Sequence, residues 1–386
     1  MDYQLSPLEI KMQQDLAAFC RAEIAPRAKM LDSSSRPEAC KYMKENLKLL
    51  SQGGCLEAGH IGDVIDLVAV YLASEEIAKA CPASFLSARA STFLCAGALR
   101  LFGTPDQKQR YIPELMKAER VGAFAYSEDQ AGSDMAAITT VAHKDGKTWR
   151  LDGEKNIVVN APIADVFLVL AYSEKDADAQ SGMSIFVCDK GAKGLKIEEP
   201  VETMGLRGVP MAGISMNDCV ATGILGGTPG KGYEQATRIL TMGKVGIAAL
   251  CVGIGNACTE ISVKHSKERK AFGKPIGLYQ DVGFRLADMF TINDLGRMLA
   301  LRAAWAINSG EQEADIMAAC AKLFASEAVT KIANWGMQIF AGHGYVAGSD
   351  IERLYRDAKF GEICEGTSEL QRSLIASHEL DKFLPR

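Results

Sequence analysis

The sequence predicts an α+β fold in which a helical N-terminal region is followed by a central β domain and then by a bundle of long helices. Three observations lead to this prediction. Apolar residues recur every three or four positions from residue 6 to about 119, short β-rich runs begin at about residue 121, and helical periodicity returns after "GGTPGKGYEQA". The 386 residues suffice for two or three structural domains.

The first region, residues 1–120, is expected to be helical throughout. Its segments "SPLEIKMQQDLAAFCRAEIAP" and "DLVAVYLASEEIAKA" have apolar residues at helical spacing and begin or end at Ser, Asp and Pro, which favour helix termini.

The second region, residues 121–232, is expected to form the β domain. Its β-rich runs, "NIVVNAP", "VFLVLAY", "MSIFVCD", "LKIEEPV" and "GISMNDCVA", are separated by Gly and Asp residues that favour turns.

The third region, residues 233–386, is expected to form the bundle. Long helices are predicted at 236–267, 280–308 and 318–340, with Ala and Gly at positions where antiparallel helices can pack closely.

Composition excludes several function classes. The net charge of −5 gives no basic surface for nucleic acid, and the eleven scattered cysteines include no Cys-x-x-Cys pair. They indicate reduced thiols in a cytoplasmic protein, with no metal site. No export signal is visible, and the most apolar window, "VGIAALCVGIGNAC", is too short and glycine-rich to span a bilayer.

Two glycine-rich stretches do not fit known phosphate-binding patterns. "GGTPGKG" is one residue short of a phosphate loop and no Ser or Thr follows Lys231, and "GHG" at 342–344 follows a helix rather than a strand. A cofactor would therefore be held by another architecture.

Three other stretches are candidates for a binding site. "YSEDQAGSD" (126–134) is a polar loop in the β domain, "SKERKAFGKPIGLYQ" (266–280) interrupts a long helix with a cation and an aromatic ring, and "MQIFAGHGY" (337–345) ends another helix in glycines. Each taken alone is as compatible with a solvated helix face or a helix cap.

A fourth candidate is "GEICEGTSELQRSLIA", where Glu365 precedes Gly366. Thr367 or Ser368 can cap the helix that follows, and Ser368 with Gln371 fits a capping box. On local rules alone Glu365 is an acid near the positive end of a helix dipole.

Together these stretches resemble the acyl-CoA dehydrogenase family over essentially the whole chain. "FAYSEDQAGSD", "RKAFGKPIGLYQ", "QIFAGHGY" and "EICEGTSELQR" are similar to its signatures in order and separation, and "FGTPDQKQRYIPEL" is similar to its approach to the β domain. The resemblance implies a central domain of the β-barrel or sandwich kind, a C-terminal four-helix bundle, and FAD bound in a homotetramer.

The resemblance also implies that Glu365 is the catalytic base. FAD-dependent α,β-dehydrogenation of an acyl-CoA gives the 2-enoyl-CoA, with a carboxylate removing the Cα proton while flavin N5 takes the Cβ hydride. The implied electron acceptor is an electron-transferring flavoprotein.

Further positions carry over from the family, some of them expected to reach the FAD of a neighbouring subunit. The positions expected to bind FAD are Phe124, Tyr126, Ser127, Ser133, Ile157, Val159, Arg269, Phe272, Gln280, Gln338, Gly342, Thr367 and Glu369. Those expected to contact the substrate are Ser133, Thr241, Lys244 and Gly366.

Two departures from the family leave alternatives open. Ile157 and Val159 replace the usual Trp-x-Thr near the flavin, and Thr241 with Lys244 replaces the Asp-x-x-Arg that contacts CoA. "NAPIADV" is similar to members that act on carrier-bound substrates. The alternatives are the same chemistry on a carrier protein, an oxygen-using oxidase, and a flavin-binding helical protein without catalysis.

Overall fold

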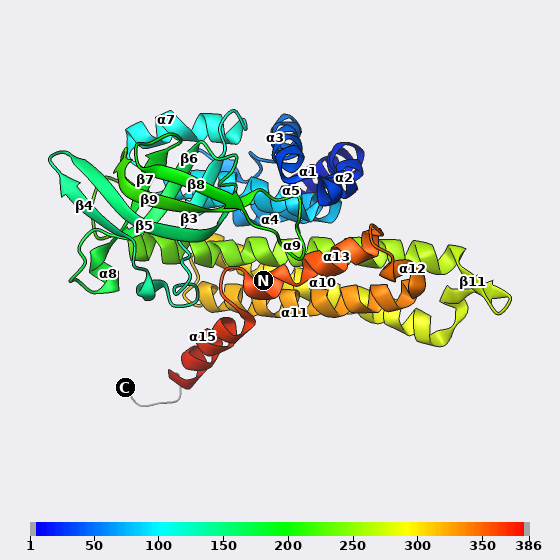
Figure 1. Ribbon diagram of the computed structural model, residues 1–386. Helices are drawn as coiled ribbons and strands as arrows, with labels where there is room; N and C mark the ends of the chain where they lie inside the picture. Colours follow the sequence, from blue (N-terminus) through cyan, green and yellow to red (C-terminus); the bar gives the residue numbers. More distant parts are fainter. Residues whose placement is uncertain (1–4, 382–386) are drawn as a thin grey trace.

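The chain folds into a helical N-terminal part, a central sheet and a long helical C-terminal part, which confirms the predicted fold class. The structure is a computed structural model and describes residues 5–381. In Figure 1 the sheet lies at one end of the molecule, above the long helices, with the N-terminal helices beside it.

Four of the N-terminal helices begin at residues whose side chains cap the first turn. Capping boxes at Ser6, Ser35 and Thr104 start three of them, and the Asp66 carboxylate accepts the first backbone N–H groups of a fourth. The helices are α1 (Pro7–Phe19), α2 (Ala28–Ser33), α3 (Arg36–Gln52), α4 (Leu67–Ala80), α5 (Pro82–Arg89), α6 (Ala96–Phe102) and α7 (Pro105–Met116), with π-helical turns η1 (Cys20–Ile24) and η3 (Ala90–Cys95).

The central domain is one eight-stranded mixed sheet with the order β10-β7-β6-β4-β5-β9-β8, in which β3 pairs with β6 in parallel. On β6, Phe167 and Val169 enter a core inside the β domain, while Leu168 and Leu170 enter the larger core shared with the helices. Both faces of this strand are buried, which explains its continuous apolar run. The strands are β3 (Gly122–Ala125), β4 (Val141–Asp145), β5 (Thr148–Val159), β6 (Val166–Tyr172), β7 (Met183–Asp189), β8 (Leu195–Pro200), β9 (Met211–Ala221) and β10 (Gly223–Ile224).

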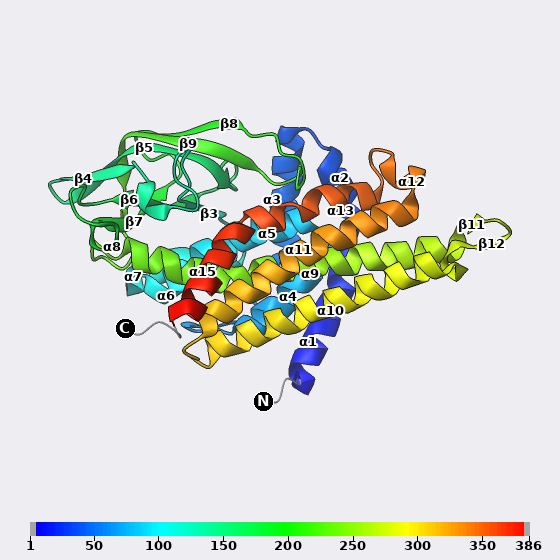
Figure 2. The ribbon, with the colours of Figure 1, turned by 90° about the horizontal axis from the view of Figure 1, so that it is seen from below.

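Three long helices run side by side along the molecule: α9 (Gly232–Glu268), α10 (Gln280–Asn308) and α11 (Ala314–Phe340), seen in Figure 2. Glycine allows α9 to approach α4 closely, because a Cβ at Gly253 would lie 2.7 Å from the Glu75 carbonyl oxygen. Shorter segments complete this part: β11 (Lys270–Ala271), β12 (Lys274–Pro275), α12 (Gly342–Tyr345), α13 (Asp350–Ala358), α14 (Phe360–Ile363) and α15 (Ser368–Asp381).

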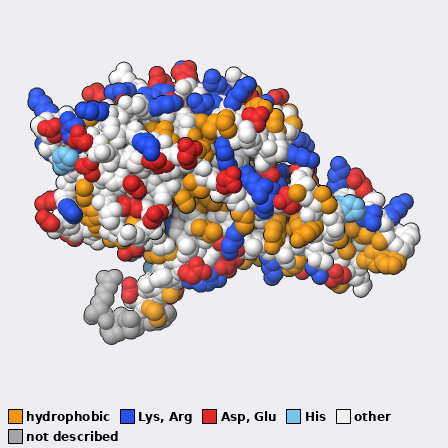
Figure 3. Space-filling view, in the orientation of Figure 1, with side chains coloured by type: hydrophobic (Ala, Val, Ile, Leu, Met, Phe, Trp, Pro, Cys, Tyr) orange, Lys and Arg blue, Asp and Glu red, His pale blue; other side chains and the backbone are white. Residues whose placement is uncertain are grey.

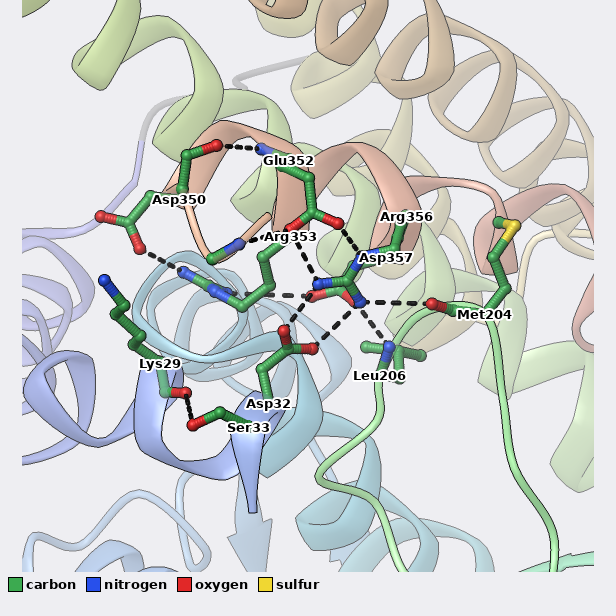
Figure 4. A network of polar contacts seen from close by, with 12 residues as sticks. Lys29, Asp32, Ser33, Met204, Leu206, Asp350, Glu352, Arg353, Arg356 and Asp357 are labelled. Atoms are coloured by element: carbon green, nitrogen blue, oxygen red, sulfur yellow. Dashed lines mark hydrogen bonds and ion pairs between the residues drawn. The ribbon is translucent and has the colours of Figure 1, made fainter. Parts of the chain in front are cut away.

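A polar network ties the three parts together (Figure 4). Arg356 of α13 contacts the Asp32 carboxylate of α2 at 2.6 Å and donates to the Met204 carbonyl oxygen of the loop between β8 and β9 at 3.2 Å. The Leu206 N–H donates to Asp357, whose pKa burial raises to about 6. The network therefore fixes α13, and the chain that follows it, relative to both other parts.

Two helical stretches, Pro82–Phe102 and Gly232–Glu268, are long and apolar enough to cross a membrane by length and composition alone. In each, 83% of the most apolar window is buried inside the protein. That burial is typical of core helices, as the close packing of α9 illustrates.

Candidate active site

Glu365 lies in a strained turn between α14 and α15. Its φ is +52° and that of Gly366 is +91°, so a non-glycine residue adopts the left-handed conformation. Such a residue costs roughly 1–3 kcal/mol and persists only where its surroundings hold it. The turn is therefore a place where the fold maintains a particular side-chain position.

The helix cap at this turn differs in part from the sequence prediction. The Thr367 hydroxyl accepts from the Leu370 N–H at 3.3 Å, so Thr367 is the cap. The predicted capping box of Ser368 and Gln371 is wrong. The Gln371 side chain instead donates to the carbonyl oxygens of Glu365 at 3.3 Å and Gly366 at 3.0 Å, because the left-handed turn directs both carbonyls towards it.

A buried lysine of α11 holds the other side of the turn. The Lys322 side chain, fully buried, donates to the Gly366 carbonyl oxygen at 2.7 Å and to the Glu362 carbonyl oxygen at 3.2 Å. Hydrogen bonds from charged donors contribute about 1.5–3 kcal/mol each. Lys322 and Gln371 together fix the backbone on which Glu365 stands.

The Glu365 carboxylate forms a buried ion pair with Arg89, the last residue of α5. The Arg89 Nη2 atom lies 2.5 Å from Glu365 Oε1, and the two side chains are 4% and 5% exposed. Nη2 also donates to the Gly243 carbonyl oxygen at 3.0 Å. Within residues 5–381, neither carboxylate oxygen accepts a well-directed hydrogen bond, and Arg89 Nε donates none.

Two glycines of α9 make room for this pair. A Cβ at Gly243 would lie 2.4 Å from Glu365 Oε2 and 2.5 Å from Arg89 Nη2, and a Cβ at Gly246 would lie 2.5 Å from Arg89 Nε. The spacing of one helical turn lets α9 pass directly beneath both charged groups.

Three cations surround the single carboxylate. Burial raises the pKa of Glu365, while the charges of Arg89, Lys322 and Lys244 oppose that rise. Burial likewise lowers the pKa of Lys244 and of Lys322. The site therefore carries a buried carboxyl whose proton affinity is raised, within a positively charged shell.

A narrow cavity of about 40 Å³ lies next to the pair, between α4, α5, η3 and α9. It has room for roughly three water molecules. Its lining is mainly apolar, and the Tyr71 hydroxyl is buried with no hydrogen-bond partner in the described part of the chain. The lining includes Tyr71, Phe85, Arg89, Phe93, Met242 and Val245.

The loop that begins at Tyr126 is held by a second buried ion pair. Lys155 Nζ, on β5, donates to the Tyr126 carbonyl oxygen at 3.0 Å and contacts Glu128 Oε1 at 2.7 Å. Burial opposes the charge on Glu128, but hydrogen bonds from Lys155 and Thr140 outweigh it and lower the pKa of Glu128 to about 2. Burial raises the pKa of the Tyr126 phenol, and the charge of Glu365 adds to that rise.

The predicted site residues fall into two groups at opposite ends of the molecule (Figures 1 and 2). One group lies on the β domain or on the Glu365 turn and its surroundings: Phe124, Tyr126, Ser127, Ser133, Ile157, Val159, Thr241, Lys244, Glu365, Gly366, Thr367 and Glu369. The other lies around the β11–β12 hairpin, the start of α10, and the junction of α11 and α12: Arg269, Phe272, Gln280, Gln338 and Gly342.

The exposure of these residues fits a large cofactor with an apolar ring and polar edges. Ile157 is 55% exposed beside the half-buried Ser127 and Val159, and a Cβ at Gly342 would meet open space. At the far end Phe272 is 98% exposed next to the exposed Arg269. An aromatic ring, an apolar surface and an exposed cation are groups that can contact a flavin and a diphosphate, so these residues fit FAD.

Several residues that build the site were not found from the sequence. Lys322 had a detectable signal, because it is the single charge in the apolar helical run "AACAKLFAS". Arg89 had none, since "FLSARAST" reads equally well as a helix with one exposed cation. Its pairing with Glu365 is seen only in the structure, where the glycines of α9 pack closely against both side chains.

Comparisons with known proteins show the family to which the chain belongs. Family models described as acyl-CoA dehydrogenase N-terminal, middle and C-terminal domains match residues 6–119, 123–219 and 230–380. The chain is 36% identical over 383 residues to the probable acyl-CoA dehydrogenase YngJ of Bacillus subtilis strain 168, covering 97% of this chain and 99% of that protein.

Two further relatives are short-chain enzymes. The chain is 34% identical to the mitochondrial short-chain specific acyl-CoA dehydrogenase of Sus scrofa, covering 96% of this chain and 90% of that protein. The butyryl-CoA dehydrogenase structure from Megasphaera elsdenii superposes with a TM-score of 0.90 at 29% identity, covering 98% of this chain and 100% of the other. The chain therefore belongs to the acyl-CoA dehydrogenase family of FAD-dependent oxidoreductases that act on acyl-CoA.

Proposed function

We propose that this enzyme introduces a double bond between Cα and Cβ of an acyl-CoA, with Glu365 as the base that removes the Cα proton. The observation that carries the proposal is the buried Glu365 carboxylate on a turn held by Lys322 and Gln371. The electron pair of the broken Cα–H bond forms the new double bond. FAD, when bound, accepts the hydride that leaves Cβ with the other electron pair.

The environment of Glu365 suits a base for a weak carbon acid. Burial raises the pKa of its carboxyl, which increases its proton affinity towards that required at neutral pH. The ion pair with Arg89 opposes this effect and favours the charged form that can accept a proton.

The test is the variant Glu365→Gln. We expect it to retain FAD and to slow flavin reduction by an acyl-CoA at least about 10³-fold, because the proton acceptor is gone. Anaerobic stopped-flow absorbance measures the reduction. The control is Glu362→Gln, whose carboxylate lies three residues away and pairs with Lys359. A Glu365→Gln enzyme that bleaches at the control's rate would exclude Glu365 as the base.

We also propose that the FAD site of a neighbouring subunit in a homo-oligomer is completed by Arg269, Phe272, Gln280, Gln338 and Gly342. The family resemblance implies that this oligomer is a tetramer. These residues are exposed, and they share their end of the molecule with the exposed apolar side chains of Leu278, Tyr345 and Val346, where Figure 3 has a concentration of hydrophobic surface. Cofactor retention should then fall as the protein is diluted below its assembly constant. Analytical ultracentrifugation with FAD absorbance measures both. A monomer with stoichiometric FAD would contradict the proposal.

A carrier-bound substrate is a second candidate. Thr241 and Lys244, which occupy the family's CoA-contacting positions, are only 6% and 8% exposed. Side chains as buried as these can make few contacts with a nucleotide at the protein surface. The measurement is kcat/KM for one acyl group on CoA, on pantetheine and on a carrier protein, where a preference for CoA above about 100-fold would favour an ordinary CoA enzyme.

We propose an electron-transferring flavoprotein as the electron acceptor, as the family resemblance implies. The alternative is an oxidase that uses oxygen. Reduced enzyme exposed to air distinguishes them, because an oxidase reoxidises within its turnover time and a dehydrogenase does not.

A further inference from the structure

We propose that Arg89 recognises an anionic group on the acyl chain, so that the preferred substrate is the thioester of a short dicarboxylic acid. This inference rests on the proposed function and specifies its substrate class. It starts from the position of the guanidinium, which lines the narrow cavity and touches the Glu365 carboxylate.

Arg89 lies next to the place where the reacting carbons of a substrate would be. A base must lie within hydrogen-bond reach of the proton that it removes. Arg89 Nη2 lies 2.5 Å from Glu365 Oε1, so an acyl chain with its Cα at Glu365 has its next atoms beside the guanidinium. An acyl chain that enters the cavity therefore contacts the Arg89 guanidinium.

Arg89 has more hydrogen-bond donors than its protein neighbours use. A guanidinium has five N–H donors in a planar fork that matches a carboxylate. Nη2 serves the Gly243 carbonyl oxygen, while Nε is buried and donates to no group in residues 5–381. Arg89 therefore has a buried N–H donor that no group in residues 5–381 uses, next to the cavity that its side chain lines.

The charge beside Arg89 changes during the proposed reaction. When Glu365 takes the Cα proton it becomes neutral, and Arg89 loses the only carboxylate that it contacts among the described residues. A neutral alkyl chain would leave a buried, unpaired cation, which is strongly unfavourable. A carboxylate on the substrate keeps Arg89 paired throughout the proton transfer.

The surrounding charges favour the same kind of substrate. Lys244 and Lys322 also act on the Glu365 charge, so one carboxylate faces three cations. Asp315 acts on Lys244 and Glu362 acts on Lys322, whereas the one carboxylate paired with Arg89 in the described chain is that of Glu365. One further anionic group from the substrate would reduce this imbalance.

The size of the cavity limits the length of the chain. Its volume of about 40 Å³ and the aromatic rings of Phe85 and Phe93 leave no space for a long tail. Arg89 lies over the Phe93 ring, 5.5 Å from its centre, which fixes the height of the guanidinium. The second carboxylate must therefore be only a few carbons from the thioester.

The experiment compares matched pairs of substrates that differ in the end group: succinyl-CoA with butyryl-CoA, and glutaryl-CoA with valeryl-CoA. Anaerobic flavin reduction by the wild-type holoenzyme should favour at least one dicarboxylic member by about 100-fold in second-order rate constant. Arg89→Met should abolish or reverse that preference, and Arg89→Lys should keep part of it. Arg110→Gln, which removes a surface guanidinium paired with Asp189, should leave the ratio unchanged.

Calorimetric binding of the same four thioesters to Glu365→Gln holoenzyme separates this inference from the proposed function. Tighter binding of a dicarboxylic member that is lost in Arg89→Met/Glu365→Gln supports the inference even if no thioester reduces the flavin, an outcome that would refute the proposed function. Equal or weaker binding of both dicarboxylic members, or wild-type reduction by the neutral members at equal or higher rates, would overturn the inference while leaving a dehydrogenase in place.

Discussion

The substitution Gly243→Ala tests the close packing of α9 against the Glu365–Arg89 ion pair. The new methyl group would lie 2.4 Å from Glu365 Oε2 and 2.5 Å from Arg89 Nη2. Both contacts are about 1 Å shorter than ordinary van der Waals contact, so the Glu365 and Arg89 side chains must move together. The helix backbone itself can accept alanine, since Gly243 is in the interior of α9.

The expected effects on stability and on activity differ in size. Overpacking costs about 1–3 kcal/mol, but replacing glycine by alanine within a helix returns about 1 kcal/mol, so the net loss of unfolding free energy is about 0–2 kcal/mol. A shift of about 1 Å in a catalytic group can reduce the rate 10²-fold. We therefore expect a folded, FAD-containing enzyme that reduces its flavin roughly 100-fold more slowly.

The assay is anaerobic flavin reduction together with urea unfolding. The matched control is Gly296→Ala on α10, where the added Cβ would meet Ala325 at an ordinary 3.6 Å. This control should keep its rate and gain up to about 1 kcal/mol of stability. A Gly243→Ala enzyme within about threefold of the wild-type rate would refute the reasoning.

Two other substitutions test the supports of the site. Lys322→Met removes the hydrogen bonds to the carbonyl oxygens of Gly366 and Glu362, and we expect flavin reduction to slow by up to roughly 100-fold with FAD content unchanged, whereas Lys331→Met, exposed on the same helix, should have no effect. Glu128→Gln leaves Lys155 buried without its charged partner and should cost about 3–5 kcal/mol in urea unfolding. Because folding lowers the pKa of Glu128 from 4.5 to about 2, its ionised form stabilises the wild type above pH 4.5, and this contribution is lost as the pH falls towards 2. A variant with the wild-type acid dependence, or a Lys322→Met enzyme with the wild-type rate, would show that these contacts are dispensable.

The sequence predicts the long helices and the most buried strands well. Helical spacing was sustained over the predicted ranges 236–267 and 280–308, and the runs "VFLVLAY" and "MSIFVCD" coincide with β6 and β7. These elements bury enough apolar side chain for their periodicity or continuity to be distinct.

Other strands were missed for identifiable reasons. β3 is "GAFA", with three small residues and no β-branched one, and it forms because β6 offers a parallel partner. β4, "VAHKD", and the first part of β5, "TWRLDGEK", carry charges on solvent-facing positions, so the hairpin that they form has little apolar pattern.

Some residues of the candidate site could be named from the sequence, and others could be found only from the structure. Glu365 could be named as a candidate from the sequence because its neighbours "EGTSELQR" form a local motif. Arg89 could not, because its partner is 276 positions away along the chain and is reached only through the glycines of α9. A contact made by tertiary packing leaves no periodic signal in either segment.

The placement of the two groups of predicted cofactor-binding residues at opposite ends of one chain has a genetic consequence. If each cofactor site takes its halves from two subunits, subunits with Glu365→Gln and subunits with Arg269→Ala would be inactive alone, yet a mixed assembly would contain sites in which both halves are intact. Two alleles that each abolish activity could then complement one another in the same cell, whereas two alleles that damage the same end could not.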